Sequence, residues 1–333
     1  MKNINSLAAA VILGPMLWAS GTGAAQSPAT GAEQRYPVRP IRMIVAAAPG
    51  GGADIVGRIF AQKFNEAWGQ PVVVDNRSSS GGIVATEIVA KSRPDGYTLL
   101  MRFSSLTTTP PFYPKLPFDA VRDFAPVTLL TTSPGVVAVL PALGVRNVRE
   151  LIQLAKSQPG KLLYGSSGTG TLPHLIGEML RLAAGIDIRH VPYKSVAPSI
   201  TAQLSGEVHL TFPALASGAP HFKSGRLRAL AVTSLIRAHS APDVPTVDES
   251  GLPGFEAIAW YGLLAPAGTP RVIIDKIQRE SARVAAIPEL RESLIAQGND
   301  PVASTPDAFG ERIRKELDQW SKLVKQLGLK LEE

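Results

Sequence analysis

Two glycine-rich turns, each lying between an apolar run and a helical pattern, constrain the fold of this 333-residue chain more than any other feature. Pro49-Gly50-Gly51-Gly52 follows the apolar run 41–48, and residues 165–170 follow a shorter run at 161–164. A strand, a tight turn and a helix N-terminus in this order present free backbone N–H groups above the turn. Because such ends favour anions, the two turns predict two similar lobes that hold one anionic ligand between them.

The organisation of the chain around these turns is that of an α/β protein. Apolar runs alternate with helical periodicity, as they do in parallel βαβ units. A first series of such units begins at residue 36, and residues 132–135 form a plausible passage into a second series. We predict one lobe made of residues 36–131 and 255–333 and a second lobe made of residues 132–254, each with a mainly parallel sheet flanked by helices.

Two further segments complete this prediction. An apolar strand at 257–265 returns the chain to the first lobe, and three helices that begin with proline follow it, at 270–286, 288–297 and 306–327. We expect all three to pack on the first lobe. The proline-rich connection 103–124 has no clear periodicity, and because long loops in compact domains are usually functional, we expect it to line the cleft.

The N-terminus has the pattern of a secretory signal peptide. Lys2 provides a basic start, residues 7–18 are mostly apolar, and residues 19–25 are small. A membrane anchor needs about 18 or more continuous apolar residues, and this run is shorter. We predict a signal peptide over 1–25, a disordered leader over 26–35, and a mature protein in the periplasm.

Composition and motif searches exclude several classes of function. The chain has no cysteine, so it has no disulfide, thiolate zinc site or thiol nucleophile. Its net charge is +7, but the basic residues are dispersed, so nucleic-acid binding is not indicated. No dinucleotide, P-loop, nucleophile-elbow or metal-ligand pattern is present. We expect no cofactor, no metal and no enzymatic activity, although an exported α/β hydrolase with scattered catalytic residues stays open.

The residues around the turns have structural as well as ligand-binding interpretations. Asp54 is suited to capping the helix that follows the first turn. His174 lies inside the first helical turn after Gly170, where a histidine either binds a ligand or caps and packs. Tyr193 follows a strand end from which it could reach the cleft. The sequence alone leaves each of these alternatives open.

Short motifs in a characteristic order extend over nearly the whole chain after residue 35. They include Tyr36-Pro37, Pro49-Gly50-Gly51 with Asp54 and Arg58, Asn76-Arg77 with Gly81-Gly82, Pro94-Asp95-Gly96-Tyr97, Gly165-Ser166-Ser167-Gly168-Thr169-Gly170 with His174, His190-Val191-Pro192-Tyr193-Lys194, and Ala265-Pro266-Ala267-Gly268-Thr269-Pro270. Together they resemble the extracytoplasmic solute receptors of tripartite tricarboxylate transporters, often called Bug or TctC-like receptors. The order and spacing of the motifs make the resemblance specific.

The resemblance implies a Venus-flytrap periplasmic binding protein, type II-like, that closes on a carboxylate and delivers it to the membrane subunits of a transporter. It implies that both glycine turns hold the carboxylate. We expect a monomer that uses no cofactor. A periplasmic sensor for a membrane kinase is the alternative. The candidate ligand-binding residues are Ala47, Ala48, Gly50, Gly51, Asp54, Ile83, Ser104, Ser166, Gly168, Thr169, Gly170, Thr171, His174, Tyr193 and Pro213.

Three changes, at four positions, depart from the pattern of the resembling family in the direction of less polarity or bulk. The chain has Ala46 and Ala47 where an aromatic residue commonly follows proline, Ile83 in place of asparagine, and Pro213 in place of aspartate. Loss of an aspartate argues against an amino-acid ligand, whose ammonium group would need that partner. These departures predict a roomier, less polar pocket and a carboxylate with an aromatic or otherwise apolar body.

Overall fold

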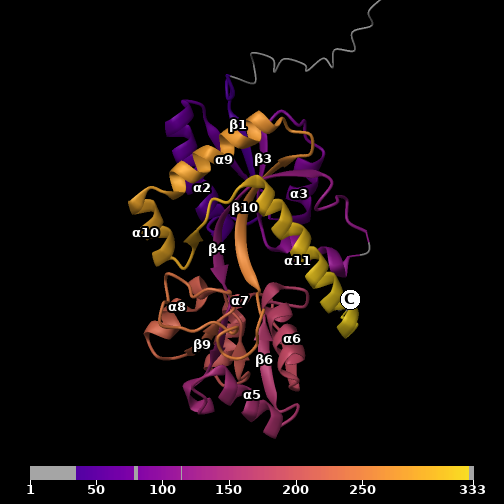
Figure 1. Ribbon diagram of the computed structural model, residues 1–333, viewed down its shortest axis with the longest axis vertical. Helices are drawn as coiled ribbons and strands as arrows, with labels where there is room; N and C mark the ends of the chain where they lie inside the picture. The colour runs from indigo at the N-terminus through magenta and orange to yellow at the C-terminus, as the bar shows by residue number, and fades with distance from the viewer. Residues whose placement is uncertain (1–34, 79–81, 114, 330–333) are drawn as a thin grey trace, which may run out of the picture.

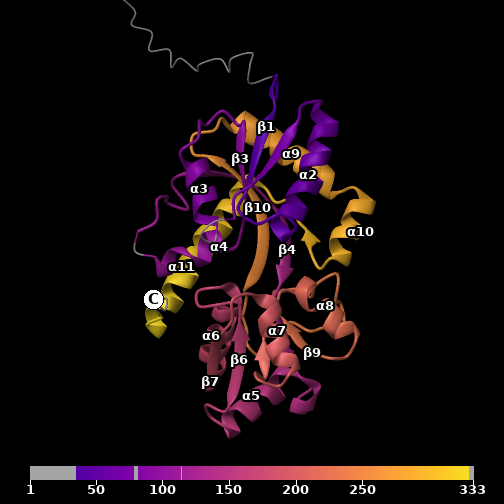
Figure 2. The same cartoon turned by 180° about the vertical axis from the view of Figure 1, so that it is seen from behind.

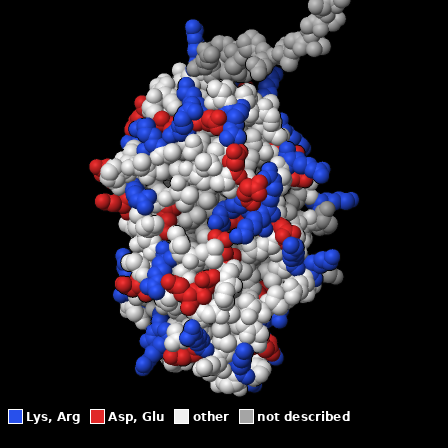
Figure 3. All heavy atoms as spheres, in the orientation of Figure 1, with Lys and Arg blue, Asp and Glu red and all other residues white. Residues whose placement is uncertain are grey.

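The computed structural model describes residues 35–78, 82–113 and 115–329, and it arranges them in two lobes, one above the other in Figure 1. The predicted signal peptide and nearly all of the predicted leader lie outside the described residues. No helix in the described part of the chain is both long and apolar enough to cross a membrane. Figure 3 shows basic and acidic side chains interspersed over one face of the molecule.

The first lobe is built on a six-stranded sheet with the order β11, β4, β10, β3, β1, β2. Along β1, Met43 and Val45 pack into one core and Ile44 into another, so both faces of the strand are buried. This explains the continuous apolar run in the sequence. The strands are β1 (Ile41–Val45), β2 (Val72–Asn76), β3 (Thr98–Phe103), β4 (Phe124–Pro134), β10 (Ile258–Pro266) and β11 (Asp300–Pro301).

Helices cover both faces of this sheet. Residues of α2 and α9 pack into the core on one face, and residues of α3 and α11 pack into the core on the other face. A short helix α4 and a 3-10 turn η2 lie at the end of the lobe that faces the second lobe (Figure 2). The bounds are α2 (Gly52–Trp68), α3 (Ile83–Ala90), α4 (Ser105–Thr108), η2 (Pro110–Phe112), α9 (Arg271–Ala285), α10 (Pro288–Ala296) and α11 (Pro306–Leu327).

The second lobe has a five-stranded sheet with the order β7, β6, β8, β5, β9. Its helix α8 was not predicted, because Gly218 and Pro220 interrupt the helical pattern. The strands are β5 (Val136–Val139), β6 (Leu162–Ser166), β7 (Ile188–Pro192), β8 (Leu210–Thr211) and β9 (Arg228–Val232). The helices are η3 (Pro141–Leu143), α5 (Val148–Ser157), α6 (Leu172–Ala184), α7 (Val196–Leu204) and α8 (Leu215–Lys223).

The predicted two-lobed α/β fold is confirmed, but both sheets are mixed rather than mainly parallel. β1 pairs in parallel with β2 and β3, whereas β10 runs antiparallel to β3 and β4. In the second sheet β6 pairs in parallel with β7 and β8, and β5 runs antiparallel to β8 and β9. The reason is that the chain passes between the lobes along strands, β4 into β5 through Gly135 and later back along β10. The exact lobe limits stay a prediction.

Helix α11 corrects one expectation. Its first half packs on the first lobe, where Phe309 and Ile313 join the core that contains Trp260. Its last turns do not, because Trp320 and Leu323 belong to the core of the second lobe. Figure 1 shows α11 descending from the first lobe toward the level of α6. The apolar periodicity of this helix is continuous, so the change of partner along it has no signal in the sequence.

Candidate ligand-binding site

A cavity of about 460 Å³ lies between the lobes. This volume is within the usual range for small-molecule sites. The first lobe contributes β3, α4, η2 and β10 to its walls, and the second lobe contributes the turn after β6 together with α7 and α8. The lining residues are Ile83, Phe103, Ser104, Ser105, Thr108, Thr109, Phe112, Tyr113, Gly135, Ser167, Thr169, Gly170, Thr171, Leu172, Pro173, Val196, Phe212, Ala214, Ser217, Ala259 and Tyr261.

The walls of this cavity are aromatic and hydroxylic. Five aromatic side chains line it, and none of the lining residues carries a charge. A charged ligand group must therefore be held by neutral donors, namely hydroxyls and backbone N–H groups. Among the residues that the structure describes, no cluster of histidine and carboxylate side chains could hold a metal ion.

The second glycine turn is held by an internal hydrogen-bond network. Gly168 N donates to Ser166 Oγ (3.0 Å), and Gly170 N donates to His174 Nδ1 (3.1 Å). The Gly168 carbonyl accepts from Thr171 Oγ1 (2.7 Å) and from Thr171 N (3.3 Å). The network therefore uses the N–H groups of both glycines and of the threonine that precedes α6.

The remaining N–H groups of the turn are the ones suited to binding an anion. Those of Ser167, Thr169 and Leu172 have no acceptor among the described residues, and all three residues line the cavity. They lie at the N-terminus of α6, where the helix dipole also favours a negative charge. The turn thus leaves the N–H groups of Ser167, Thr169 and Leu172 unpaired beside the cavity, while Gly168, Gly170 and Thr171 hold its shape.

One buried and one half-buried histidine, His174 and His190, contact this turn. His190 Nε2 lies 2.6 Å from Ser166 Oγ, and the His190 ring packs against the His174 ring in a tilted arrangement with ring centroids 4.2 Å apart. His174 is 3% exposed. Burial lowers the pKa of both imidazoles to about 4, helped at His190 by the neighbouring His174. Both rings are therefore neutral near pH 7, and only a neutral His174 Nδ1 can accept the Gly170 N–H.

The first glycine turn is held by a carboxylate. Asp54 is buried and accepts from Gly50 N (2.8 Å), Arg58 Nε (2.9 Å) and Asn76 Nδ2 (2.9 Å). Burial alone would raise the pKa of the Asp54 carboxyl, but the bonds from Arg58, Gly50 and Asn76 hold that pKa below its ordinary value. A Cβ at Gly52 would lie 2.1 Å from the Tyr261 hydroxyl, so this turn abuts an aromatic side chain of the cavity wall.

The predicted site residues divide into two groups. Five line the cavity, namely Ile83, Ser104, Thr169, Gly170 and Thr171. The others are not among the lining residues, and several hold the turns or neighbouring chain instead. Tyr193, for example, donates its hydroxyl to Glu207 Oε1 (2.6 Å), and the Pro213 carbonyl accepts from Val136 N. This second group is Ala47, Ala48, Gly50, Gly51, Asp54, Ser166, Gly168, His174, Tyr193 and Pro213.

Sequence reasoning missed most of the aromatic wall. Phe103, Phe112 and Tyr113 belong to the proline-rich connection that was expected to line the cleft. The sequence therefore indicated the segment that forms this wall, but not its individual residues. Tyr261 lies in β10 and Phe212 directly follows β8, both in apolar stretches where a sequence offers no means of separating a wall residue from a core residue. Binding by any of the predicted residues stays a proposal.

Comparisons with known proteins agree with this architecture. A family model, the tripartite tricarboxylate transporter family receptor, matches residues 56–329. The chain is similar to protein BugT of Bordetella pertussis, with 36% identity over 298 residues that make up 89% of this chain and 91% of BugT.

Two solved structures are similar over most of the chain. One is R. palustris Rpa4515 with adipate (32% identity, TM-score 0.76, 89% of this chain and 100% of that chain). The other is MatC from Rhodopseudomonas palustris with bound malate (28% identity, TM-score 0.71, 87% of this chain and 100% of that chain). The resemblance indicated by the sequence motifs is confirmed. The chain belongs to the receptor family of tripartite tricarboxylate transporters, a family of periplasmic solute-binding proteins rather than enzymes.

Proposed function

We propose that this receptor captures a carboxylate with an aromatic or otherwise apolar body and delivers it to the membrane subunits of a tripartite transporter. The observation that carries the proposal is the cavity itself, with aromatic walls, neutral hydroxyls and no charged lining side chain. Structures of relatives with adipate and with malate support a carboxylate as the ligand class.

The ligand carboxylate is best accommodated at the turn before α6. The free N–H groups of Ser167, Thr169 and Leu172 supply donors without a counter-charge. The body of the ligand then lies among Phe103 and Phe212. Burying about 100 Å² of apolar surface contributes roughly 2.5 kcal/mol at most before ordering costs, so an aromatic ring gains more from these walls than a small hydroxyacid does.

Calorimetric titration of the mature protein with a panel of carboxylates tests this proposal. We expect benzoate or phenylacetate to bind more tightly than malate, and malate more tightly than citrate, whose three charges would face a cavity without a cation. Citrate binding most tightly would contradict the proposal of an apolar body. Absence of binding to every carboxylate would contradict the ligand class.

The cellular setting is also a proposal. The basic, apolar and small-residue pattern of the first 25 residues supports export with cleavage near Ala25. N-terminal sequencing of the protein recovered from a periplasmic extract tests the cleavage site. Loss of ligand uptake on deletion of the receptor, with the membrane subunits intact, tests its role in transport.

A further inference from the structure

The two lobes also touch on the side of the molecule that lies across β4 and β10 from α11. There α10 and β11 of the first lobe lie next to α8 of the second lobe, as both ribbon views show (Figure 1 and Figure 2). A Cβ at Gly298, between α10 and β11, would lie 2.6 Å from both the Cα and the backbone N of Ala216 in the first turn of α8. Real Cβ atoms essentially never show contacts under 3.0 Å, so the two backbones touch with no space for a side chain at residue 298.

A polar pair lies beside this backbone contact. Asp300 Oδ1, on β11, is buried and has no hydrogen-bond partner among the described residues. His239 Nδ1, from the second lobe, lies 3.7 Å from it. An imidazole N–H can donate to a carboxylate in either protonation state of the ring. Because the His239 side chain is 55% exposed, a small rotation that brings Nδ1 about 1 Å closer would give Asp300 the bond that it lacks.

These two contacts join packed parts of the lobes. Leu215 and Ala238 directly precede the two contact residues of the second lobe, and both are buried in one small core beneath β5 and β9. On the first lobe, Leu294 of α10 is buried in the core that also contains residues of β1. The residues that meet across the lobe boundary therefore move with their own lobes.

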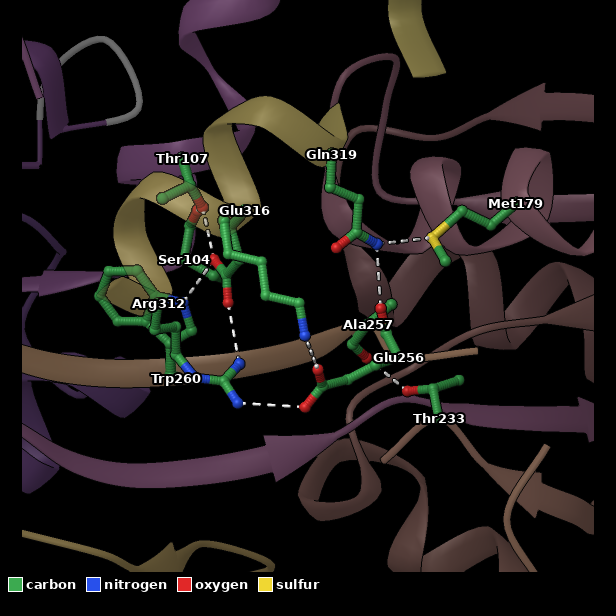
Figure 4. Close-up of polar contacts among 11 residues, drawn as sticks. Ser104, Thr107, Met179, Thr233, Glu256, Ala257, Trp260, Arg312, Glu316 and Gln319 are labelled. Atoms are coloured by element: carbon green, nitrogen blue, oxygen red, sulfur yellow. Dashed lines mark hydrogen bonds and ion pairs between the residues drawn. The ribbon is translucent and has the colours of Figure 1, made fainter. Parts of the chain in front are cut away.

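Helix α11 holds the lobes together on the other side of the strands (Figure 4). Gln319 Nε2 donates to the Glu256 carbonyl (3.1 Å) and lies 3.5 Å from Met179 Sδ of α6. One turn earlier, Arg312 Nη2 pairs with Glu256 Oε1 (3.1 Å). Separation of the lobes at α11 would also pull Trp320 out of the core of the second lobe. The lobes are therefore expected to part on the side of α10 and α8, with the α11 side as the pivot.

We propose that the two contacts form an interlobe latch, which limits and holds the closure of the cavity over its ligand. The latch consists of Gly298 and Asp300 in the first lobe and of Ala216 and His239 in the second. Ala214 and Ser217 of the same segment line the cavity, so parting at the latch moves a wall of the cavity. Hinge closure gives a ligand its contacts with both lobes, so the latch strengthens binding of any ligand held between them. The inference rests on the proposed function only for the capture of a ligand in this cavity.

Cross-linking tests the latch without a ligand. The chain has no cysteine, so His239→Cys/Asp300→Cys introduces the only two thiols, and we expect a short bismaleimide to link them within one molecule. Adding Gly298→Ala, whose Cβ must displace Ala216 by about 1 Å, should lower the linked fraction at least threefold. Gly69→Ala is the matched control, because Gly69 also follows a helix with a positive φ but has no atom within 4 Å of a Cβ. Absence of linkage in the parent, or equal linkage in the two backgrounds, would overturn the latch.

Calorimetry with benzoate tests the link to binding in the cysteine-free protein. Gly298→Ala should weaken benzoate binding fivefold or more, and Gly69→Ala less than twofold. His239→Ala and Asp300→Ala should each weaken it about two- to fivefold, and the double variant no more than either single one, because both remove the same contact. Unchanged affinity in Gly298→Ala, or additive losses in the double variant, would contradict the latch. Failure of the wild-type protein to bind any carboxylate would instead refute the proposed function, and the cross-linking result would then decide the latch by itself.

Discussion

The two glycine turns occupy equivalent places in the two lobes, yet they are stabilised by opposite means. The turn before α2 is organised by the ionised carboxylate of Asp54, which pairs with Arg58. The turn before α6 is organised by neutral groups, with His174 accepting a backbone N–H and His190 contacting Ser166. The turn before α2 therefore keeps its shape only while Asp54 is charged, whereas the turn before α6 keeps its shape only while His174 is neutral.

This difference teaches that the two halves of the proposed carboxylate site respond differently to acid. The Asp54 carboxyl has a lowered pKa, so its contribution to stability lasts to more acidic pH than that of an ordinary carboxyl. The two imidazoles have pKa values of about 4. As the pH falls, their contribution to stability is therefore lost at a higher pH than that of the Asp54 carboxyl. Four predictions test this contrast.

The largest expected effect is acid destabilisation through His174. Its folded pKa of about 4 is below the unfolded value of 6.5, so the unfolded state binds more protons between these values. The stability contribution is complete above pH 6.5 and is lost as pH falls from 6.5 toward 4, by about 3 kcal/mol at most. Denaturant unfolding from pH 7 to pH 4 measures it. His174→Asn, which keeps an acceptor but cannot titrate, should reduce the slope of the profile and leave the part due to His190, and an unchanged profile would contradict this assignment.

The next effect distinguishes the glycines. Gly168 has φ +118°, which L side chains rarely adopt, whereas Gly51 has φ −73°, which any residue adopts, although a Cβ there would lie 3.1 Å from the Ala48 carbonyl oxygen. A Cβ at Gly168 meets no atom closer than 3.5 Å, so the cost of Gly168→Ala is conformational, about 1–2 kcal/mol. We expect Gly168→Ala to weaken benzoate binding tenfold or more and Gly51→Ala to weaken it less than threefold in calorimetry. Equal losses would argue against a shape-dependent second turn.

A smaller effect is expected from neutralising the first turn. Asp54→Asn keeps an acceptor for Gly50 N but loses the charge-assisted bonds with Arg58, so the unfolding free energy should fall by roughly 1–2 kcal/mol. Asp95→Asn is the control, because the Arg39–Asp95 pair has a similar distance of 2.9 Å but is exposed and should contribute less than about 0.5 kcal/mol. Equal destabilisation by the two variants would show that Asp54 is not organising the turn.

The smallest effect concerns one hydroxyl of the second turn. Thr171→Val removes the 2.7 Å bond to the Gly168 carbonyl while preserving side-chain shape, and should lower the unfolding free energy by about 0.5–1.5 kcal/mol. Thr201→Val is the control, in which an exposed threonine bonded to a helix carbonyl is replaced. Its effect on benzoate affinity should be smaller than that of Thr171→Val. A larger affinity loss in Thr201→Val would contradict the proposed place of the carboxylate.

The elements that could be predicted from sequence are those whose own residues determine them. Helix α5, for example, carries its own cap, with Asn147 accepting from Glu150 N. Helix α8 was missed because its glycine and proline oppose the helical pattern locally, and tertiary packing of Leu215 compensates. Partner choice along α11 was missed because periodicity specifies a buried face without specifying what covers it.

The candidate site was predictable only in outline. The two turns stood out because strand, glycine and helix are adjacent in sequence. The hydrogen-bond network around Ser166 and His174 determines which N–H groups of the second turn remain free. Ser166 is part of this network, and its neighbour Ser167 lines the cavity instead. Tyr261 meets Gly52 across more than two hundred residues, and no local pattern records such a contact.

The anchoring of α11 in both lobes has a consequence for how the protein unfolds. A chain with two separate sheets could melt in two steps, one for each lobe. Here Trp320 and Leu323 complete the core of the second lobe, while Phe309 of the same helix packs in the first. Fraying of either lobe therefore exposes apolar surface in the other, and the molecule should show a single calorimetric transition, with cooperativity imposed by its last helix.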